Sequence, residues 1–169
     1  MLPPSRPPLH ADEILRALTA RGVDFVVIGG IAGVLHGSAQ ATYDLDICYA
    51  TDTGNLTALG EVLINLEARL KGIRDAVPFV PDASTLRRVE LLTMVTREGE
   101  LDILSRPAGR RGYEALRRNA ERLDLDGFSV LVASIDDLIA MKAAAGRPKD
   151  LAAIEELEAI RRLRGRRNL

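Results

Sequence analysis

The stretch VVIGGIAGVLHGSAQATYDLDICYA, residues 26–50, joins two apolar runs through a pair of glycines. The first run is β-branched and ends at Gly29 and Gly30, where the absence of a side chain lets backbone N–H groups approach a ligand closely. In the second run Asp44 and Asp46 lie two residues apart, so on a strand both carboxylates face the same side of a sheet. Two carboxylates held that close repel each other unless a cation lies between them. We therefore expect a strand, a glycine-opened helix and a second strand that presents an acidic pair to a cation.

Composition places the chain among ordinary globular proteins of one domain. Its 169 residues are 47% hydrophobic and 28% charged, with a formal net charge of −1. That net charge excludes a general attraction to nucleic acid but is compatible with a local basic surface. An aromatic content of 4%, with no Trp, argues against an aromatic platform for stacking bases.

Cysteine usage and hydropathy indicate the compartment. The single cysteine, Cys48, cannot form an internal disulfide, and its apolar neighbours favour a buried thiol over a nucleophile. A chain without disulfides fits a reducing compartment. No apolar run is long enough to cross a membrane. We expect a cytoplasmic protein with no membrane partner.

The order of the expected elements favours an α/β (α+β) fold, a single domain with a mixed twisted sheet and flanking helices. Strand and helix patterns alternate early in the chain, and strands pair by hairpins later. Strands are expected at 24–29, 45–50, 89–96, 100–104 and 122–133, the last span being a hairpin that turns at 126–127. Helices are expected from 11 to just before the stop at Gly22 and over 29–37, 55–70, 113–120, 136–146 and 150–163, with an irregular connection at 77–85 and a capping box at Ser134.

The ends of the chain differ in composition from its middle. Four prolines in the first eight residues predict a flexible arm over 1–10. We expect the folded domain over 11–163 and a basic, frayed tail over 164–169.

A third carboxylate can join the acidic pair. Asp102 lies in the strand-like stretch ELDILS, although Glu100 on the same strand face is an alternative. Lys142, on a later helix, is a candidate counter-charge for phosphate. Mg²⁺ prefers carboxylate oxygens and is often shared with substrate phosphates. Glycines, an acidic pair and a third acid are together the equipment of a two-metal phosphoryl or nucleotidyl transfer.

Other polar residues allow two interpretations. His36 either orients a phosphate or packs within a short helix. Arginines follow Asp102 closely, at Arg106, Arg110, Arg111, Arg117, Arg118 and Arg122. A charge run is often a solvated face, but a basic surface near the mouth of the site would steer a polyanionic acceptor such as RNA.

In this order, the motifs resemble the nucleotidyltransferase superfamily with the polymerase-beta-like fold, and within it the AbiEii/MenT-like branch of toxin nucleotidyltransferases. The resemblance covers about residues 23–160. Its most specific parts are the apolar strand into Gly29-Gly30, His36-Gly37, Thr42-x-Asp44-Leu45-Asp46 and the closing run from Lys142 through Gly146-Arg147-x-Lys149-Asp150.

The resemblance implies a role for each of these positions. Asp44, Asp46 and Asp102 would hold two Mg²⁺ ions, and Asp102 would also help to deprotonate the acceptor hydroxyl. Gly29 and Gly30 would cradle the triphosphate of a nucleoside triphosphate. Lys142 would contact its phosphates, and Arg147 and Asp150 would brace or line the site.

The resemblance also implies a function. The acceptor would be RNA, at a tRNA 3′ end, and the protein would be a toxin with a cognate antitoxin partner. One departure is Gln40, because relatives often carry arginine before the Thr-x-Asp run. Two alternatives follow: nucleotidyl transfer to a protein or an aminoglycoside-like small molecule, and a catalytically weak nucleotide-binding or partner-binding protein of the same fold.

Overall fold

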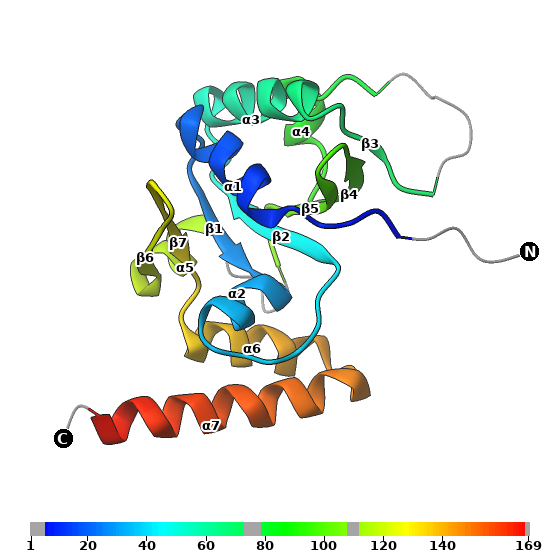
Figure 1. Cartoon of the computed structure of the whole chain (residues 1–169). Helices are drawn as coiled ribbons and strands as arrows, with labels where there is room; N and C mark the ends of the chain where they lie inside the picture. The colour runs from blue at the N-terminus through cyan, green and yellow to red at the C-terminus, as the bar shows by residue number, and fades with distance from the viewer. Residues whose placement is uncertain (1–5, 73–78, 108–111, 168–169) are drawn as a thin grey trace, which may run out of the picture.

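Figure 1 shows the computed structural model of the chain, which describes residues 6–72, 79–107 and 112–167. Its centre is a seven-stranded mixed sheet in the order β3-β4-β5-β2-β1-β7-β6, which confirms the predicted fold class. The strands are β1 (Phe25–Ile28), β2 (Asp44–Tyr49), β3 (Arg69–Leu70), β4 (Leu91–Thr96), β5 (Gly99–Leu104), β6 (Glu121–Leu125) and β7 (Phe128–Val132). The helices are α1 (Ala11–Ala20), α2 (Gly29–Leu35), α3 (Thr53–Asn65), α4 (Ala83–Arg87), α5 (Tyr113–Asn119), α6 (Ile135–Ala145) and α7 (Leu151–Arg167), with a 3₁₀ turn over Pro148–Asp150.

Helices cover both faces of the central strands, which explains their apolar sequences. All four residues of β1 are buried, and in β2 only Asp44 and Asp46 interrupt a buried run. In the view of Figure 1, α1, α3 and α4 lie above these strands, and α2, α6 and α7 lie below them. The two aspartates are therefore the polar exceptions on an otherwise buried strand.

Strand pairing brings distant segments of the sequence together. β2 runs antiparallel to β1 and parallel to β5. Its register places Asp46 beside Ile28 on one side and beside Asp102 on the other. Because Ile28 is the last residue of β1, the glycine that opens α2 follows at the same level of the sheet.

Several predicted boundaries are confirmed. The Ser134 side chain accepts a hydrogen bond from the Asp137 N–H at 3.1 Å, and Gly146 ends α6 with a φ of 64°. The β4–β5 and β6–β7 pairs form the two expected hairpins.

The predicted helix over 55–70 is wrong at its end. α3 stops at Asn65, Glu67 takes a left-handed φ of 55°, and Arg69–Leu70 pairs with β4 as a short strand. Pairing with a strand that lies far away in the sequence outweighs the local leucine period, a tertiary effect that periodicity alone does not capture.

The predicted irregular connection at 77–85 is wrong where α4 begins. The Asp82 side chain caps this helix and accepts a hydrogen bond from the Thr85 N–H at 2.8 Å. Positions 77 and 78 of the same prediction lie outside the described residues. The local signal for this helix start was Asp82, since aspartate is a preferred N-cap residue.

Both ends of the chain carry contacts that a free arm or tail would lack. The His10 N–H donates to the Glu98 carbonyl at 2.8 Å, although residues 1–5 lie outside the described part. α7 continues past its predicted end to Arg167, and Arg164 donates to the Glu121 carboxylate at 3.1 and 3.2 Å. Positions 164–167 of the predicted tail are thus helical, while 168–169 are outside the description.

None of the helices in the described part of the chain combines the length and the apolar composition that crossing a bilayer requires.

Candidate active site

Three aspartates from two adjacent strands meet on one face of the sheet. Asp44 and Asp46 lie on β2, and Asp102 is the register partner of Asp46 on β5. One carboxylate oxygen from each lies within 4.8 Å of the other two, and all three side chains are half-buried. We call this group the aspartate trio. Its oxygen-only donor set suits a hard divalent cation such as Mg²⁺.

Glu100, the alternative third acid, is engaged elsewhere. It is the register partner of Asp44 and is only 4% exposed. Its carboxylate accepts a hydrogen bond from Lys71 Nζ at 3.0 Å and lies 3.9 Å from the Arg6 guanidinium. These cations neutralise Glu100, so the geometry brings Asp102 rather than Glu100 into the trio.

Repulsion within the trio changes its protonation. Burial, reinforced by the charges of Asp44 and Asp102, raises the pKa of Asp46 to about 8, against the opposing charge of Lys142. Burial and the Asp44 charge raise the pKa of Asp102 to about 6, against the opposing charge of Lys71. A divalent cation would offset this repulsion and displace the protons.

The glycine pair leaves space that a side chain would fill. Gly29 has a φ of 68°, and a Cβ atom there would overlap the Asp46 carboxylate. A Cβ atom at Gly30 would come within 2.7 Å of Thr42 Oγ1. Gly29 therefore requires glycine, whereas a side chain at Gly30 would have to displace that of Thr42; both glycines line a cavity beside the aspartate trio.

Two cations near the trio share one buried acid. Arg147 Nε donates to Asp150 Oδ2 at 2.7 Å, and Lys142 Nζ lies 3.8 Å from Asp150 Oδ1. Asp150 is 5% exposed. The structure thus brings together the three residues predicted from the closing run, with Asp150 bracing both cations.

Two cavities flank the trio. The glycine-side cavity, of about 370 Å³, is lined by the trio together with Gly29, Gly30, Gln40, Lys142, Arg147 and Lys149. The Asp102-side cavity, of about 260 Å³, shares Asp46, Asp102, Lys142 and Arg147 with the first cavity, and its remaining wall is mainly aliphatic: Leu91, Leu104, Pro107, Leu138 and Met141. Gln40 gives the first cavity a neutral amide, while Arg147 and Lys149 give it positive charge. The trio therefore lies between a polar cavity, which carries both carboxylates and cations, and a second cavity whose outer wall is aliphatic.

Two predicted candidates are structural. His36 is buried, and its Nε2–H donates to the Ala133 carbonyl at 2.7 Å, which favours the packing interpretation. Cys48 is fully buried, and burial raises the pKa of its thiol to about 12, so the thiol stays protonated.

The arginines that follow Asp102 do not form one surface. Arg106 and Arg118 line a separate cavity. Arg117 lies 4.0 Å from Glu114, and Arg122 donates to the Ser129 hydroxyl at 3.1 Å. Arg110 and Arg111 lie outside the described residues.

Sequence reasoning missed Lys71. Its N–H donates to the Thr93 carbonyl at 3.0 Å, and Thr93 is the register partner of Asp102. The ammonium group is close enough to oppose the pKa rise of Asp102. No local pattern marks this lysine, because it follows a stretch predicted as helix and reaches the site only through the β3–β4 pairing.

Comparison with known proteins identifies a family for the chain. A family model described as "Nucleotidyl transferase of unknown function (DUF2204)" matches residues 9–169. No protein with a curated description matches the sequence.

Solved structures share the fold at low sequence identity. LnuA, a lincosamide antibiotic adenylyltransferase with bound lincomycin, is 15% identical over 90% of this chain and 99% of its own, with a TM-score of 0.59. ANT(2″)-Ia, in complex with adenylyl-2″-tobramycin, is 16% identical over 94% of this chain and 96% of its own, with a TM-score of 0.52. TM1012 from Thermotoga maritima, described as a candidate nucleotidyltransferase, is 16% identical over 92% of this chain and 90% of its own, with a TM-score of 0.51.

Proposed function

The chain belongs to the nucleotidyl transferase family of unknown function designated DUF2204, and from this premise we propose that the aspartate trio transfers a nucleoside monophosphate from a nucleoside triphosphate to an acceptor hydroxyl. The observation that carries the proposal is the meeting of three carboxylate oxygens within 4.8 Å on neighbouring strands. Two Mg²⁺ ions held by these oxygens would stabilise the charge that develops on the attacking and leaving oxygens.

The reaction places one substrate on each side of the trio. The acceptor oxygen forms a bond to the α-phosphorus, the bond from that phosphorus to the bridging oxygen breaks, and pyrophosphate leaves. The acceptor proton would pass to Asp102, whose carboxylate would be ionised once a divalent cation has displaced its proton.

The glycine-side cavity suits the triphosphate. Gly29 and Gly30 leave the backbone accessible, and Lys142, Arg147 and Lys149 supply positive charge on the same cavity. Asp150 holds Lys142 and Arg147 in place before phosphate arrives. The Gln40 amide does not remove the positive character of this wall.

For the acceptor we propose RNA, at a tRNA 3′ end. Support comes from Arg106, which lies only four residues beyond Asp102 and lines a cavity of its own. A toxin role with an antitoxin partner, and membership of the AbiEii/MenT-like branch, stay predictions from the resemblance.

A small-molecule acceptor is the second candidate. The Asp102-side cavity is small, and the wall that it does not share with the glycine-side cavity is mainly aliphatic, which suits a compact, partly apolar molecule. LnuA and ANT(2″)-Ia, which share the fold, are antibiotic-modifying enzymes by their names and bound molecules. A protein acceptor has no comparable support.

Transfer of labelled nucleotide tests the proposal. The protein is incubated with Mg²⁺, each α-labelled nucleoside triphosphate in turn, and either total tRNA, lincomycin or tobramycin, beside an Asp44→Ala/Asp46→Ala variant. Label in tRNA that the double variant abolishes is the expected result. Label on an antibiotic would replace the RNA acceptor with the second candidate. Nucleotide binding without pyrophosphate release from any mixture would overturn the enzymatic proposal.

A further inference from the structure

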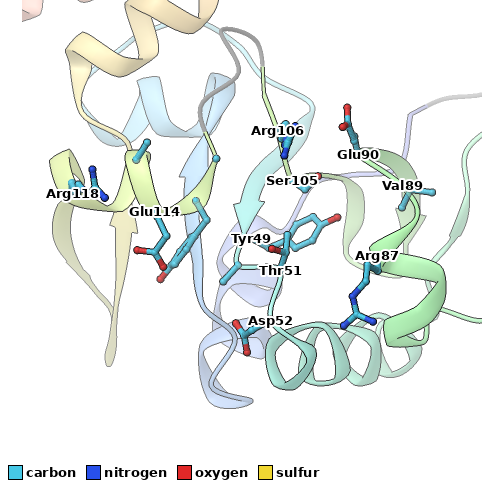
Figure 2. Close-up of a pocket in the computed structure, with 14 residues that line it drawn as sticks. Tyr49, Thr51, Asp52, Arg87, Val89, Glu90, Ser105, Arg106, Glu114 and Arg118 are labelled. Atoms are coloured by element: carbon cyan, nitrogen blue, oxygen red, sulfur yellow. The ribbon is translucent and has the colours of Figure 1, made fainter.

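A third cavity lies beyond the carboxyl ends of β2 and β5, between α4 and α5. Its volume is about 890 Å³, within the range of ligand-binding pockets. Figure 2 shows Tyr49 and Ser105 in its middle, Arg118 on the α5 side and Arg87 on the opposite side. We call it the arginine cavity and define it by Tyr49, Arg87, Ser105, Arg106, Tyr113 and Arg118.

The arginine cavity shares a wall with the Asp102-side cavity. Glu90 and Arg106 line the arginine cavity, and the residues that follow them, Leu91 and Pro107, line the Asp102-side cavity. The Ser105 N–H donates to the Glu90 carbonyl at 3.0 Å and ties the two wall segments together. Since a strand rises about 3.3 Å per residue, the backbone of Arg106 lies within about 13 Å of that of Asp102. Because neighbouring side chains on a strand point to opposite faces, one elongated molecule would reach both cavities by passing around the ends of these strands.

Three arginines and three acids line the arginine cavity, so its lining is balanced in charge. What distinguishes it is that two of the arginine side chains have no partner among the described residues. Arg106 and Arg118 form no ion pair or hydrogen bond with another residue in the part of the chain that the structure describes. By contrast, the Asp52 side chain caps α3 by accepting a backbone N–H, and Glu114 lies 4.0 Å from a neighbouring arginine on α5. The Glu90 carboxylate points away from Tyr49 in Figure 2.

A buried hydroxyl adds a second polar feature. Tyr49 is only 1% exposed, and its hydroxyl has no hydrogen-bond partner among the described residues. Ser105 lies close by without completing that bond. A buried hydroxyl left without a partner is costly, so a ligand or an ordered water at this position would be favourable.

We propose that the arginine cavity binds phosphodiester groups of the acceptor strand a few nucleotides before its reacting 3′ hydroxyl. The inference rests on the proposed function and extends it to acceptor recognition. Guanidinium groups match phosphate oxygens in geometry and charge, and such contacts position a strand without reading its sequence. A distance of up to about 13 Å corresponds to roughly two to four steps between nucleotides at 3.4 Å or more per phosphate, so an acceptor needs at least about three nucleotides to reach the cavity.

Acceptor length provides the test. The wild-type protein, Arg106→Gln, Arg118→Gln and the double variant are compared in transfer to an eight-nucleotide RNA and to a dinucleotide, which is too short to reach the cavity. We expect the double variant to raise the KM for the longer RNA by about 10- to 100-fold while kcat changes little. Kinetics with the dinucleotide should not change.

The matched control is Arg122→Gln, because Arg122 lies on β6 shortly after α5, donates to the Ser129 hydroxyl and does not line the arginine cavity. This variant should behave like the wild type with both acceptors. Tyr49→Phe keeps the buried ring and removes the hydroxyl, so it should raise the KM for the longer RNA only, by about threefold to tenfold.

Two outcomes overturn the inference alone: a KM for the longer RNA that the double variant leaves unchanged, or an equal loss with the dinucleotide. Binding of a fluorescent eight-nucleotide RNA without nucleoside triphosphate is measured in parallel by anisotropy. If the wild type transfers nucleotide to no RNA, the proposed function fails at its acceptor. In that case, weaker RNA binding by the double variant still supports the cavity, and equal binding overturns it.

Discussion

Replacing Asp46 by asparagine should make the metal-free protein more stable while abolishing nucleotidyl transfer. The pKa of Asp46 is raised from 3.8 to about 8, chiefly by burial and then by Asp44 and Asp102. A folded pKa above the unfolded value means that the folded state holds the proton more tightly. The stabilising contribution of this carboxyl is therefore complete below about pH 4 and is lost as the pH rises through 8.

The size of the effect follows from the same shift. One pKa unit corresponds to about 1.4 kcal/mol, so the upper bound is about 1.4 kcal/mol per pH unit between pH 4 and 8. Asparagine keeps part of the burial cost, and removing one charge also relieves Asp102. We therefore expect Asp46→Asn to gain about 1 to 3 kcal/mol over the wild type between pH 5 and pH 8, or roughly 2 to 10 °C in Tm.

The assay is urea and thermal unfolding in EDTA at pH 5 and pH 8, with labelled-nucleotide transfer measured on the same preparations. Asp124→Asn is the matched control, because Asp124 is an exposed aspartate on β6, away from the trio. It should change stability by less than about 0.5 kcal/mol at either pH. A variant at Asp46 that is no more stable than the wild type at pH 8, or a gain that does not grow with pH, would refute the reasoning.

Four further outcomes are expected. Gly29→Ala should cost at least about 2 kcal/mol more than Gly22→Ala in urea unfolding, because both glycines have positive φ and only Gly29 faces the Asp46 carboxylate. Lys142→Met should lower kcat/KM for the nucleoside triphosphate by about 100-fold, and an unchanged value would remove this lysine from the triphosphate site. Lys71→Met should move the acidic limb of the pH–rate profile upward, since its charge opposes the pKa rise of Asp102; a limb that stays in place contradicts this. Added Mg²⁺ should raise Tm more at pH 8 than at pH 5, and a shift that does not depend on pH would argue against binding through the trio.

Local sequence patterns were sufficient for the elements that carry the trio. The β-branched run before the glycines, the Asp-x-Asp alternation and the hairpin around Glu98-Gly99 each follow from nearest-neighbour preferences, and the structure has all three. Leu45 and Ile47 are buried, which confirms that they point into the core while Asp44 and Asp46 point to the opposite face of β2. The register between β2 and β5 is different in kind, because it depends on which strands pair and not on either strand alone.

The features of the site that were missed arise from such long-range pairing, whereas the missed helix α4 had a local capping residue in Asp82. Arg69–Leu70 joins β4, and this short strand ends the predicted helix early and brings Lys71 beside the site. The ion pairs of Glu100 with Lys71 and Arg6 also depend on contacts among three segments that are far apart in the sequence. Sequence could therefore name two acids for the third position but could not choose between them.

The aspartate trio is better explained by binding than by stability. Lys142 and Lys71 each oppose the pKa rise of one trio member, yet the pKa of Asp46 still reaches about 8 and that of Asp102 about 6. The protein's own cations thus compensate only part of the repulsion among the three carboxylates. One more lysine or arginine near the trio would be enough to neutralise it fully. A fully neutralised site would gain stability but would bind a divalent cation weakly, because the repulsion that the cation relieves adds to its affinity. The repulsion that remains is therefore the feature that would favour a divalent cation at this site.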